Sequence, residues 1–533
     1  MLHKGDSLIS QLISDIIKNH ITDIPRHHEI SFINDPKLGD YSSNVAFLLA
    51  KAQNSLPLDI ANALATKLTK HKEFSSVSVA GKGFINFNLS DKLLFTEVGE
   101  SLKENFGKVN IGNRKKILVE FISANPTGPL NVVQARAGTF GNALVNLLRF
   151  ANYDAIAEYY INNTGTQIDL LYESFLARVN ELKGKPAAIP EGGYNGSYLI
   201  DLAKKISESK LPENEWRNHL LQTIISMQKD SIAKLAIHFD NFAEESTFIP
   251  RRELVLKKLK DLTYQKEDAI WFKSSDYGDS EDRVFITATG RPTYFLSDLA
   301  YHWDKFDRGF ETLINIWGPD HHGYIARMKG GISALGFDRE QLIIIIAQQV
   351  SLLRNKEKIV MSKRAGEFVT LDDVMNEIGP DALKFFLLMR RASQHLEFDL
   401  ALARKTAQEN PVYYVQYAYA RINSILKHAQ EQNIKTSNQP DLILLNTPQE
   451  RSLINIIIHY PDVIVTCAKN YEPHHLIYYL LQLANSFHKF YESVRVVTDD
   501  EKLSQARIFL CRAVHRVLQE TLSIIGVSKP EKM

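Results

Sequence analysis

The chain has 533 residues and a net charge of +1, and 44% of its residues are hydrophobic. This composition is typical of a folded globular protein, and it excludes a disordered chain and a nucleic-acid binder that relies on overall positive charge. Two cysteines, Cys467 and Cys511, are too few for a disulfide scaffold and match no metal-ligand spacing. No apolar stretch reaches the length of a membrane span, and the N-terminus lacks a signal-peptide pattern. We expect a cytoplasmic protein without membrane contact.

Residues 1–110 alternate helical patterns with short strands. The stretch SVSVAGKGFINFNLS has the alternation of two strands joined by a glycine turn. This part of the chain is expected to be a small α+β domain, and GKVNIGNRKK after it reads as a linker.

Residues 111–375 alternate strand and helix signals. The strand-like run KILVEF is followed by a loop of glycine and proline and then by a helix with Phe140, Leu144 and Leu147 on one face. The runs TLINIW and LIIIIA have the length of buried parallel strands. The alternation predicts an α/β fold with a Rossmann-like, doubly wound parallel sheet that binds ligands at the carboxyl ends of its strands. The polar, helix-rich residues from about 169 to 275 are expected to form an insertion.

Residues 376–533 contain almost no strand signal. In EPHHLIYYLLQLANSFHKFY the residues Leu476, Leu480, Leu483 and Phe487 recur at helical spacing. We expect an all-helical bundle.

Two loops could carry chemistry. In SANPTGPLNVVQARAG, residues 123–138, a strand, a tight turn and a helix start would present backbone N–H groups to a phosphate. An ordinary connection between strand and helix would look the same. In KIVMSKRAGEFVTLDDV, residues 358–374, Lys363 could carry its charge to a polyphosphate, with Thr370 as the cap of the next helix. Taken alone, such a basic loop is usually solvated surface.

Together, residues 120–138 and 358–366 resemble the two signature motifs of class I aminoacyl-tRNA synthetases. The wider chain resembles the arginyl-tRNA synthetases, because that family's motifs occur in order along nearly its whole length. These motifs are VEFISANPTGPL, EYYINNTGTQI, PTYFLSDLAYH, GPDHHGYIARM, MSKRAG, GPDALKFFLLMR, NPVYYVQYAYARI and IGVSKPEKM. GPDALK is close to the Asp-Ala-Leu-Arg signature of the family's C-terminal domain, with Lys384 in the place of the arginine.

The resemblance implies a ligase that joins L-arginine to tRNA(Arg). ATP, accompanied by Mg²⁺, would first convert arginine to arginyl-adenylate with release of pyrophosphate, and the terminal ribose of the tRNA would then take the arginyl group. No protein nucleophile is needed, so catalysis would consist of positioning and charge stabilisation. Residues 111–375 would be the catalytic domain, and the enzyme is expected to act as a monomer.

The resemblance also implies site residues. Arginine would be bound by Glu120, Asn125, Glu245, Tyr294, Asp298 and His321. Asn162 and Gln167 would line the same pocket, and Asn163 stands where the family usually has aspartate. ATP would meet Pro126, Gly128, Asn131, Gln134, Gly318, His321, Val360, Met361 and Lys363, and the catalytic set would be Asn131, Gln134, Ser362 and Lys363. His321 and His322 are expected on a loop rather than at a zinc site.

The tRNA would contact both ends of the chain. By resemblance, Phe84 and Asn86 in the N-terminal domain, residues 1–110, would read the tRNA elbow. Tyr414, Tyr417 and the terminal Met533 in the helical domain, residues 376–533, would meet the anticodon, and aromatic faces suit unstacked bases. Two tyrosines three residues apart on a helix are equally consistent with a helical core.

Three positions in the ATP loop and one in the second motif depart from the family pattern. The family's two histidines are replaced by Asn131 and Gln134, which can still donate hydrogen bonds but cannot become cations. Val133 stands where a glycine leaves room for adenine, and Val360 replaces a lysine. The chain is therefore an active synthetase with a changed ATP loop, a non-catalytic tRNA-binding relative, or an unrelated nucleotide-binding protein of the same topology. We favour the active synthetase, because Glu120, Asp298, Ser362 and Lys363 are all kept.

Overall fold

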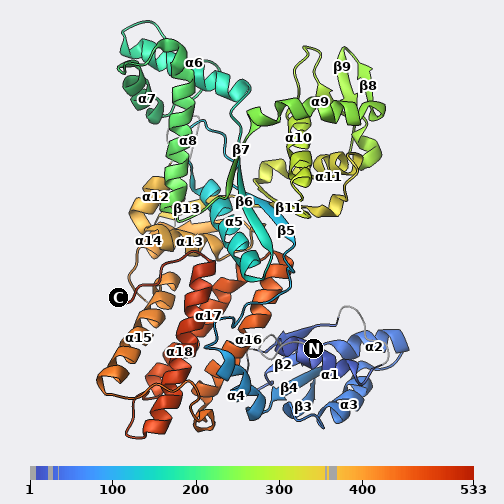
Figure 1. The fold of residues 1–533 in the computed structure, drawn as a ribbon, viewed down its shortest axis with the longest axis vertical. Helices are drawn as coiled ribbons and strands as arrows, with labels where there is room; N and C mark the ends of the chain where they lie inside the picture. Colours follow the sequence, from blue (N-terminus) through green and yellow to red (C-terminus); the bar gives the residue numbers. More distant parts are fainter. Residues whose placement is uncertain are drawn as a thin grey trace. The chain divides into compact units, whose positions relative to one another are not determined.

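The protein is described by a computed structural model. It covers residues 8–21, 28–33, 35, 37–354, 357–358, 369–407 and 409–533. The chain divides into two units, which Figure 1 shows in sequence colours. One unit is made of Met1–Ile111, Tyr413–Ile524 and Ser528–Met533, and the other of Gly112–Val412 and Ile525–Val527. Among the described residues, no helix is long and apolar enough to cross a membrane.

A five-stranded parallel sheet forms the centre of the second unit. Its strands run in the order β12-β11-β5-β6-β7, and every neighbouring pair is parallel. The strands are β5 (Lys116–Glu120), β6 (Asp154–Ile161), β7 (Asn241–Glu244), β11 (Thr312–Trp317) and β12 (Leu342–Ile346). The chain winds outward from β5 through β6 to β7 and then continues on the other side with β11 and β12. The predicted doubly wound parallel sheet is confirmed, and its switch point lies between β5 and β11.

The expected insertion is divided by a strand of the sheet. Residues 169–275 contain β7, which pairs with β6, so the inserted elements fall on either side of it. The helices α6 (Thr166–Leu182), α7 (Ser197–Ser207) and α8 (Trp216–Lys234) precede β7, and they enclose a core of their own that includes Phe175 and Trp216. After β7 come α9 (Ile249–Lys258) and an antiparallel sheet of β8 (Thr263–Lys266), β9 (Ala269–Phe272) and β10 (Arg283–Ile286).

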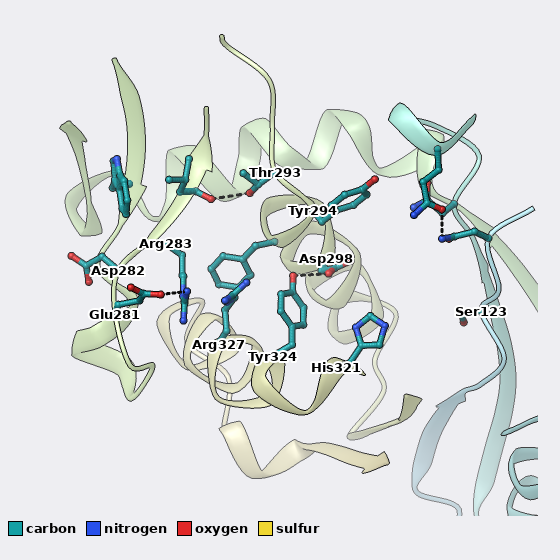
Figure 2. A pocket seen from close by; sticks show the side chains of 16 residues that line it. Ser123, Glu281, Asp282, Arg283, Thr293, Tyr294, Asp298, His321, Tyr324 and Arg327 are labelled. Atoms are coloured by element: carbon teal, nitrogen blue, oxygen red, sulfur yellow. Dashed lines mark hydrogen bonds and ion pairs between the residues drawn. The ribbon is translucent and has the colours of Figure 1, made fainter. Parts of the chain in front are cut away.

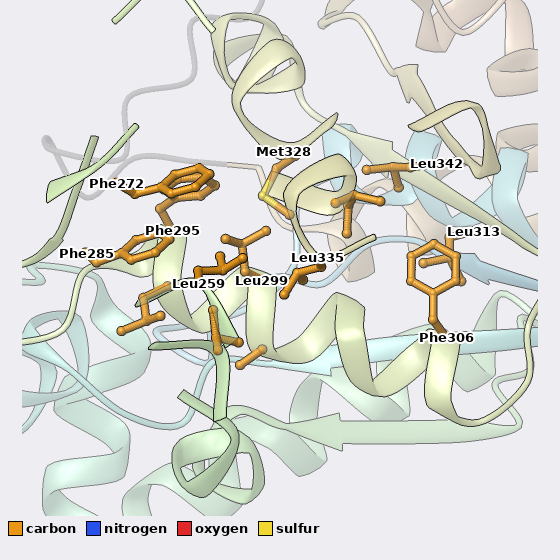
Figure 3. Close-up of a cluster of buried hydrophobic side chains, with 14 of the residues drawn as sticks. Leu259, Phe272, Phe285, Phe295, Leu299, Phe306, Leu313, Met328, Leu335 and Leu342 are labelled. Carbon is orange, nitrogen blue, oxygen red and sulfur yellow. The ribbon is translucent and has the colours of Figure 1, made fainter. Parts of the chain in front are cut away.

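A cluster of buried side chains joins this small sheet to the main one. The stacked rings of Phe272 and Phe285 pack with Phe295, and the cluster continues through Leu299 to Leu313 on β11 (Figure 3). It is covered by α10 (Tyr294–Asp307) and α11 (Ile325–Ala334). Burying these apolar groups fixes α10 against the sheet, and α10 carries several of the candidate site residues.

The remaining elements of this unit follow the sheet or connect its strands. They are α5 (Val132–Phe150), β13 (Val350–Arg354), β14 (Glu357–Lys358), α12 (Leu371–Ile378), α13 (Pro380–Leu388), β15 (Leu396–Asp399) and α14 (Leu400–Ala403). β15 pairs with β13, which places residues 376–412 with the sheet unit, whereas we expected the helical domain to begin at 376. The run LIIIIA forms β12 as expected, but β12 is an edge strand and its isoleucines are only partly buried.

The other unit combines an α+β domain with a helical bundle. Its four-stranded antiparallel sheet has the order β1-β2-β4-β3. The elements are α1 (Ile9–Lys18), β1 (Ile30–Phe32), β2 (Tyr41–Ser43), α2 (Val45–Gln53), α3 (Pro57–Leu68), β3 (Phe74–Ala80), β4 (Phe84–Leu89) and α4 (Asp91–Glu100). The bundle consists of α15 (Pro411–Glu431), α16 (Pro448–Asn470), α17 (His475–Ser493) and α18 (Glu501–Ile524).

Candidate active site

The turn that follows β5 is strained. Ile122 and Ser123 have φ angles of 66° and 40°, a region that a β-branched residue rarely occupies. Ser123 Oγ donates to Glu120 Oε1 at 2.9 Å and accepts from the Tyr160 backbone N–H at 3.2 Å. These bonds hold the turn, which directs the next residues across the carboxyl end of the sheet.

The inserted helices hold the loop between β5 and α5 by its carbonyl groups. Gln228 on α8 donates from Nε2 to Asn125 O at 3.1 Å and to Gly128 O at 2.8 Å. Tyr198 on α7 donates from its hydroxyl to Thr127 O at 2.5 Å. Backbone carbonyl groups that are shielded from water need hydrogen-bond donors, and this loop has no regular secondary structure to provide them. The inserted helices provide these donors from their side chains.

Close packing fixes the same loop from the side. Gly128 has φ 155°, and a Cβ there would lie 3.0 Å from the ring of Tyr198, so the position requires glycine. Pro126 is buried, and the Tyr159 hydroxyl lies 3.1 Å from Ala124 O. Packing and hydrogen bonds within the protein therefore fix the shape of the loop.

Asn131 and Gln134 form a capping box at the start of α5. The Asn131 side-chain oxygen accepts from the backbone N–H groups of Val133 at 2.9 Å and Gln134 at 3.3 Å, and Gln134 Oε1 accepts from Asn131 N at 2.8 Å. Because both side-chain oxygens face the backbone, both NH₂ groups face away from it. Neither amide nitrogen donates to another described residue, so a nucleotide phosphate could accept from both.

The second signature segment ends beside this helix start. Thr370 forms an isolated β-bridge with Asn131, and the Leu371 N–H donates to Leu130 O at 2.8 Å. Thr370 caps α12 in a capping box with Asp373. The fold therefore brings Thr370 and Leu371, which follow residues 358–366, to the start of α5. The expected site residues Val360, Met361, Ser362 and Lys363 lie outside the described residues.

A cavity of 720 Å³ lies between the strand ends and α10 (Figure 2). Tyr294 and Asp298, four residues apart on α10, both face it, and His321 closes one side. The lining residues are Ser123, Asn125, Asn162, Gln167, Trp271, Glu281, Asp282, Arg283, Val284, Thr293, Tyr294, Phe295, Asp298, His321, Tyr324 and Arg327. Asn125 donates to Gln167 Oε1 at 2.6 Å, which links the loop after β5 to the start of α6.

Two of the three expected arginine-binding carboxylates stand behind the cavity wall. Glu120 is buried and forms an ion pair with the fully buried Lys305, with Nζ 2.5 Å from Oε2. Glu245 is buried too, and Arg252 donates to its Oε1 at 2.9 Å. Both carboxylates already have a cation of the protein as partner.

Asp298 differs from the other two carboxylates. It lines the cavity, and the Tyr324 hydroxyl donates to its Oδ2 at 2.7 Å, but no described cation forms an ion pair with it. Burial raises the pKa of Asp298 to about 7, with help from the neighbouring charges of Glu120 and Glu245. Of the three expected arginine-binding carboxylates, Asp298 is thus the one without an ion-pair partner among the described residues.

A chain of polar contacts runs beneath the cavity. Lys305 Nζ donates to Asn315 Oδ1 at 3.4 Å, and Asn315 Nδ2 lies 2.7 Å from His302 Nε2. His302 Nδ1 lies 2.7 Å from the Asp298 carbonyl oxygen. Burial, together with the charge of Lys305, keeps the pKa of His302 well below its ordinary value. Neutral His302 can thus donate to the helix and accept from Asn315, which ties α10 to β11.

The turn after β6 explains one departure from the family pattern. The Asn162 amide nitrogen, in the orientation that satisfies both its polar atoms, donates to Glu245 Oε2 at 2.5 Å. Asn163 Nδ2 donates to Glu244 Oε2 at 2.9 Å and to Ser246 Oγ at 3.0 Å. An aspartate at position 163 would place two carboxylates face to face. Asn163 therefore suits the glutamate that this chain carries at 244.

Most of the expected pocket residues gather at one place. Asn125, Asn162, Gln167, Tyr294, Asp298 and His321 line the cavity. The sequence analysis missed Tyr324 and Arg327, although both lie in the motif GPDHHGYIARM, and it gave no signal for residues 281–284 on the opposite wall. Gly318 and His321 follow β11 as expected, but residues 319–324 form a 3₁₀ helix rather than an open loop, because Pro319 starts a helical turn.

The expected tRNA contacts differ in exposure. Phe84 is 46% exposed and Met533 is 48% exposed, whereas Asn86 is only 5% exposed and accepts from Ser42 Oγ at 2.8 Å. The Asn86 side chain is therefore not accessible to a tRNA in this structure. Tyr414 and Tyr417 are half-buried, and both rings contact His488, which is consistent with a surface groove as well as with packing.

The chain combines a doubly wound sheet with a helical domain, and a loop at the switch point of the sheet has the form of a phosphate-binding loop. This is the architecture of a class I aminoacyl-tRNA synthetase. Residues 97–191 match the family model of the class I (R) tRNA synthetase catalytic domain. Residues 7–89 match the arginyl tRNA synthetase N terminal domain, and residues 415–533 match the DALR anticodon binding domain.

Individual relatives support the same family assignment. The arginine–tRNA ligase of Syntrophotalea carbinolica is 41% identical over 98% of this chain and 96% of its own length. That of Legionella pneumophila strain Corby is 38% identical over 94% of each. The Thermus thermophilus arginyl-tRNA synthetase structure superposes with a TM-score of 0.80 over 99% of this chain and all of its own, at 20% identity, which shows the shared fold. The chain belongs to the arginyl-tRNA synthetase family.

We predict that Lys305→Met destabilises the protein strongly. The change leaves Glu120 buried without its cation, and breaking one partner of a buried pair costs about 3–5 kcal/mol. The double variant Lys305→Met with Glu120→Gln should recover most of this loss, because no unpaired charge remains. Urea unfolding followed by circular dichroism measures both. Equal stability of the single and the double variant would contradict the pairing.

Proposed function

We propose that this chain ligates L-arginine to tRNA(Arg) using ATP, through arginyl-adenylate, with release of pyrophosphate and AMP. Membership of the arginyl-tRNA synthetase family supports this activity. The observation that carries it is the cavity-lining Asp298, the one expected arginine-binding carboxylate without an ion-pair partner among the described residues. A buried carboxylate that lacks a cation favours a ligand that brings one.

The arginine side chain would place its guanidinium against Asp298. Tyr294 and Tyr324 would fix the planar group by contact with their rings and hydroxyls. Glu120 and Glu245, held by Lys305 and Arg252, would act on arginine from behind the wall through their charge and through Asn162. Asn125, Gln167 and His321 would meet the α-amino and carboxylate groups.

ATP would lie across the loop that follows β5. The amide nitrogens of Asn131 and Gln134 would donate to its phosphates where charge builds up in the transition state, in place of the family's histidines. Pro126, Gly128 and Gly318 would leave room for the nucleotide, and Ser362 and Lys363, with Val360 and Met361, would close over it. Mg²⁺ would arrive with ATP, since it binds mainly phosphate oxygens and water.

We further propose the tRNA contacts. Tyr414, Tyr417 and Met533 would meet the anticodon through the helical bundle that begins with α15, and Phe84 would meet the tRNA elbow through the domain at residues 1–110. A groove lined by Arg421, Tyr491 and Arg495 offers aromatic and cationic groups on the same bundle. We also propose that the chain acts as a monomer.

The deciding experiment is charging of tRNA with each standard amino acid, alongside ATP–pyrophosphate exchange. We expect charging with arginine and very little with lysine, because a point ammonium cannot use a bidentate site. We expect exchange to require both arginine and tRNA, since tRNA binding could complete the loops as induced closure does in other enzymes. Tight tRNA binding with no exchange under any condition would identify a non-catalytic relative instead.

A second prediction concerns pH. Between pH 6 and pH 8 the arginine side chain stays cationic and prefers ionised Asp298. Because the pKa of Asp298 is raised to about 7, the affinity for arginine should increase with pH. Between pH 6 and pH 8 the dissociation constant should fall about tenfold. Calorimetric titration of arginine measures this. Asp298→Asn should bind weakly at every pH, whereas Asp282→Asn, a control whose carboxyl pKa is kept low by Ser275, should keep the pH dependence. A flat profile in the unchanged protein would contradict this reading.

A third prediction separates the two roles of the capping box. Asn131→Ser keeps a good helix cap but removes the amide donor, so kcat should fall by about 10²-fold with little loss of stability. Asn131→Ala removes the cap as well and should also lose about 1 kcal/mol of stability. Exchange kinetics and thermal melting measure the two effects. An unchanged kcat in Asn131→Ser would mean that the amide does not act on ATP.

A further inference from the structure

The corner between α16 and α17 gathers metal-binding side chains far along the chain from the proposed active site. Tyr471 ends α16 with φ 56°, and α17 begins at His475. Glu472, His474 and His475 lie in this short corner and offer one ligand atom each, all within 4.8 Å of one another. The three residues fall within a stretch of four, and Glu472 and His475 are three residues apart.

The geometry of the set is close to that of a zinc site. Zinc holds histidine nitrogen and carboxylate oxygen at about 2.0–2.2 Å, so two of its tetrahedral ligands are about 3.3 Å apart. His475 Nε2 and Glu472 Oε2 are 3.1 Å apart, which fits this spacing. The ring centroids of His474 and His475 are 4.1 Å apart, and the ligand atoms of all three residues lie within 4.8 Å of one another.

The surroundings favour a retained ion with one open position. His474 is only 1% exposed, which keeps one ligand from competing solvent. His475 lines a cavity of 330 Å³ together with Cys467, His459 and Asp462. A water molecule from the cavity would complete the coordination.

We propose that Glu472, His474 and His475 bind one zinc ion that fastens the end of α16 to the start of α17. The alternative is an ion pair between Glu472 and His475 in the first turn of a helix, which would need no metal. The two readings differ in what added metal does to the protein. The proposal is independent of the proposed ligase activity, because none of its residues lies in the proposed arginine or ATP site.

The test uses the full chain, freed of metal with a chelator, and titrates Zn²⁺ against a chromophoric zinc indicator. We expect one equivalent of zinc per chain and a higher melting temperature when the site is filled, because an ion that binds only the folded state stabilises it. His475→Ala and Glu472→Gln should each weaken binding at least tenfold and abolish the shift in melting temperature. His219→Ala on α8, an exposed histidine, is the matched control and should change neither.

Three results would overturn the proposal. The first is zinc binding of equal affinity in the unchanged protein and in His475→Ala, with circular dichroism showing that the variant is folded. The second is zinc binding with no effect on melting temperature, which would place the ion outside the corner. The third is Co²⁺ loading that gives an octahedral instead of a tetrahedral visible spectrum.

Discussion

The buried ion pair of Lys305 and Glu120 is the contact on which the site depends. Glu120 ends the central strand β5, and Lys305 lies on α10, the helix that carries the cavity residues Tyr294 and Asp298. A buried charge is costly unless it is paired, so this ion pair favours the register in which α10 packs against β5. The same carboxylate accepts from Ser123 and so holds the strained turn that begins the nucleotide loop. One interaction thereby sets both walls of the site.

Charge pairing also explains how a pocket with several carboxylates can remain selective. The protein neutralises Glu120 and Glu245 with its own cations and leaves Asp298 with a tyrosine hydroxyl as its hydrogen-bond donor. Of these three carboxylates, Asp298 alone has no ion-pair partner among the described residues. Under the proposed function, the aromatic rings of Tyr294 and Tyr324 beside Asp298 would favour a planar cation over a compact one.

The changed ATP loop has a local explanation in the capping box. Asparagine is among the best residues at a helix N-cap, and glutamine three residues later completes the box. Asn131 and Gln134 therefore start α5 with their oxygens and keep their amide hydrogens for a ligand. The loop before them owes its shape to Gln228 and Tyr198 from the inserted helices, which bind its carbonyl groups.

The sequence by itself determined the fold class, the family and six of the sixteen residues that line the cavity. Alternating strands and helices predict a parallel sheet covered by helices, and the motifs fall at strand ends, where a doubly wound sheet binds ligands. Only the tertiary structure decided which carboxylates are already paired, since Lys305 and Arg252 carry no motif and meet their partners through packing. It also decided that β7 belongs to the main sheet, that β12 is an edge strand and that Asn86 is buried. Strand order and burial depend on contacts between distant segments, which local sequence patterns do not encode.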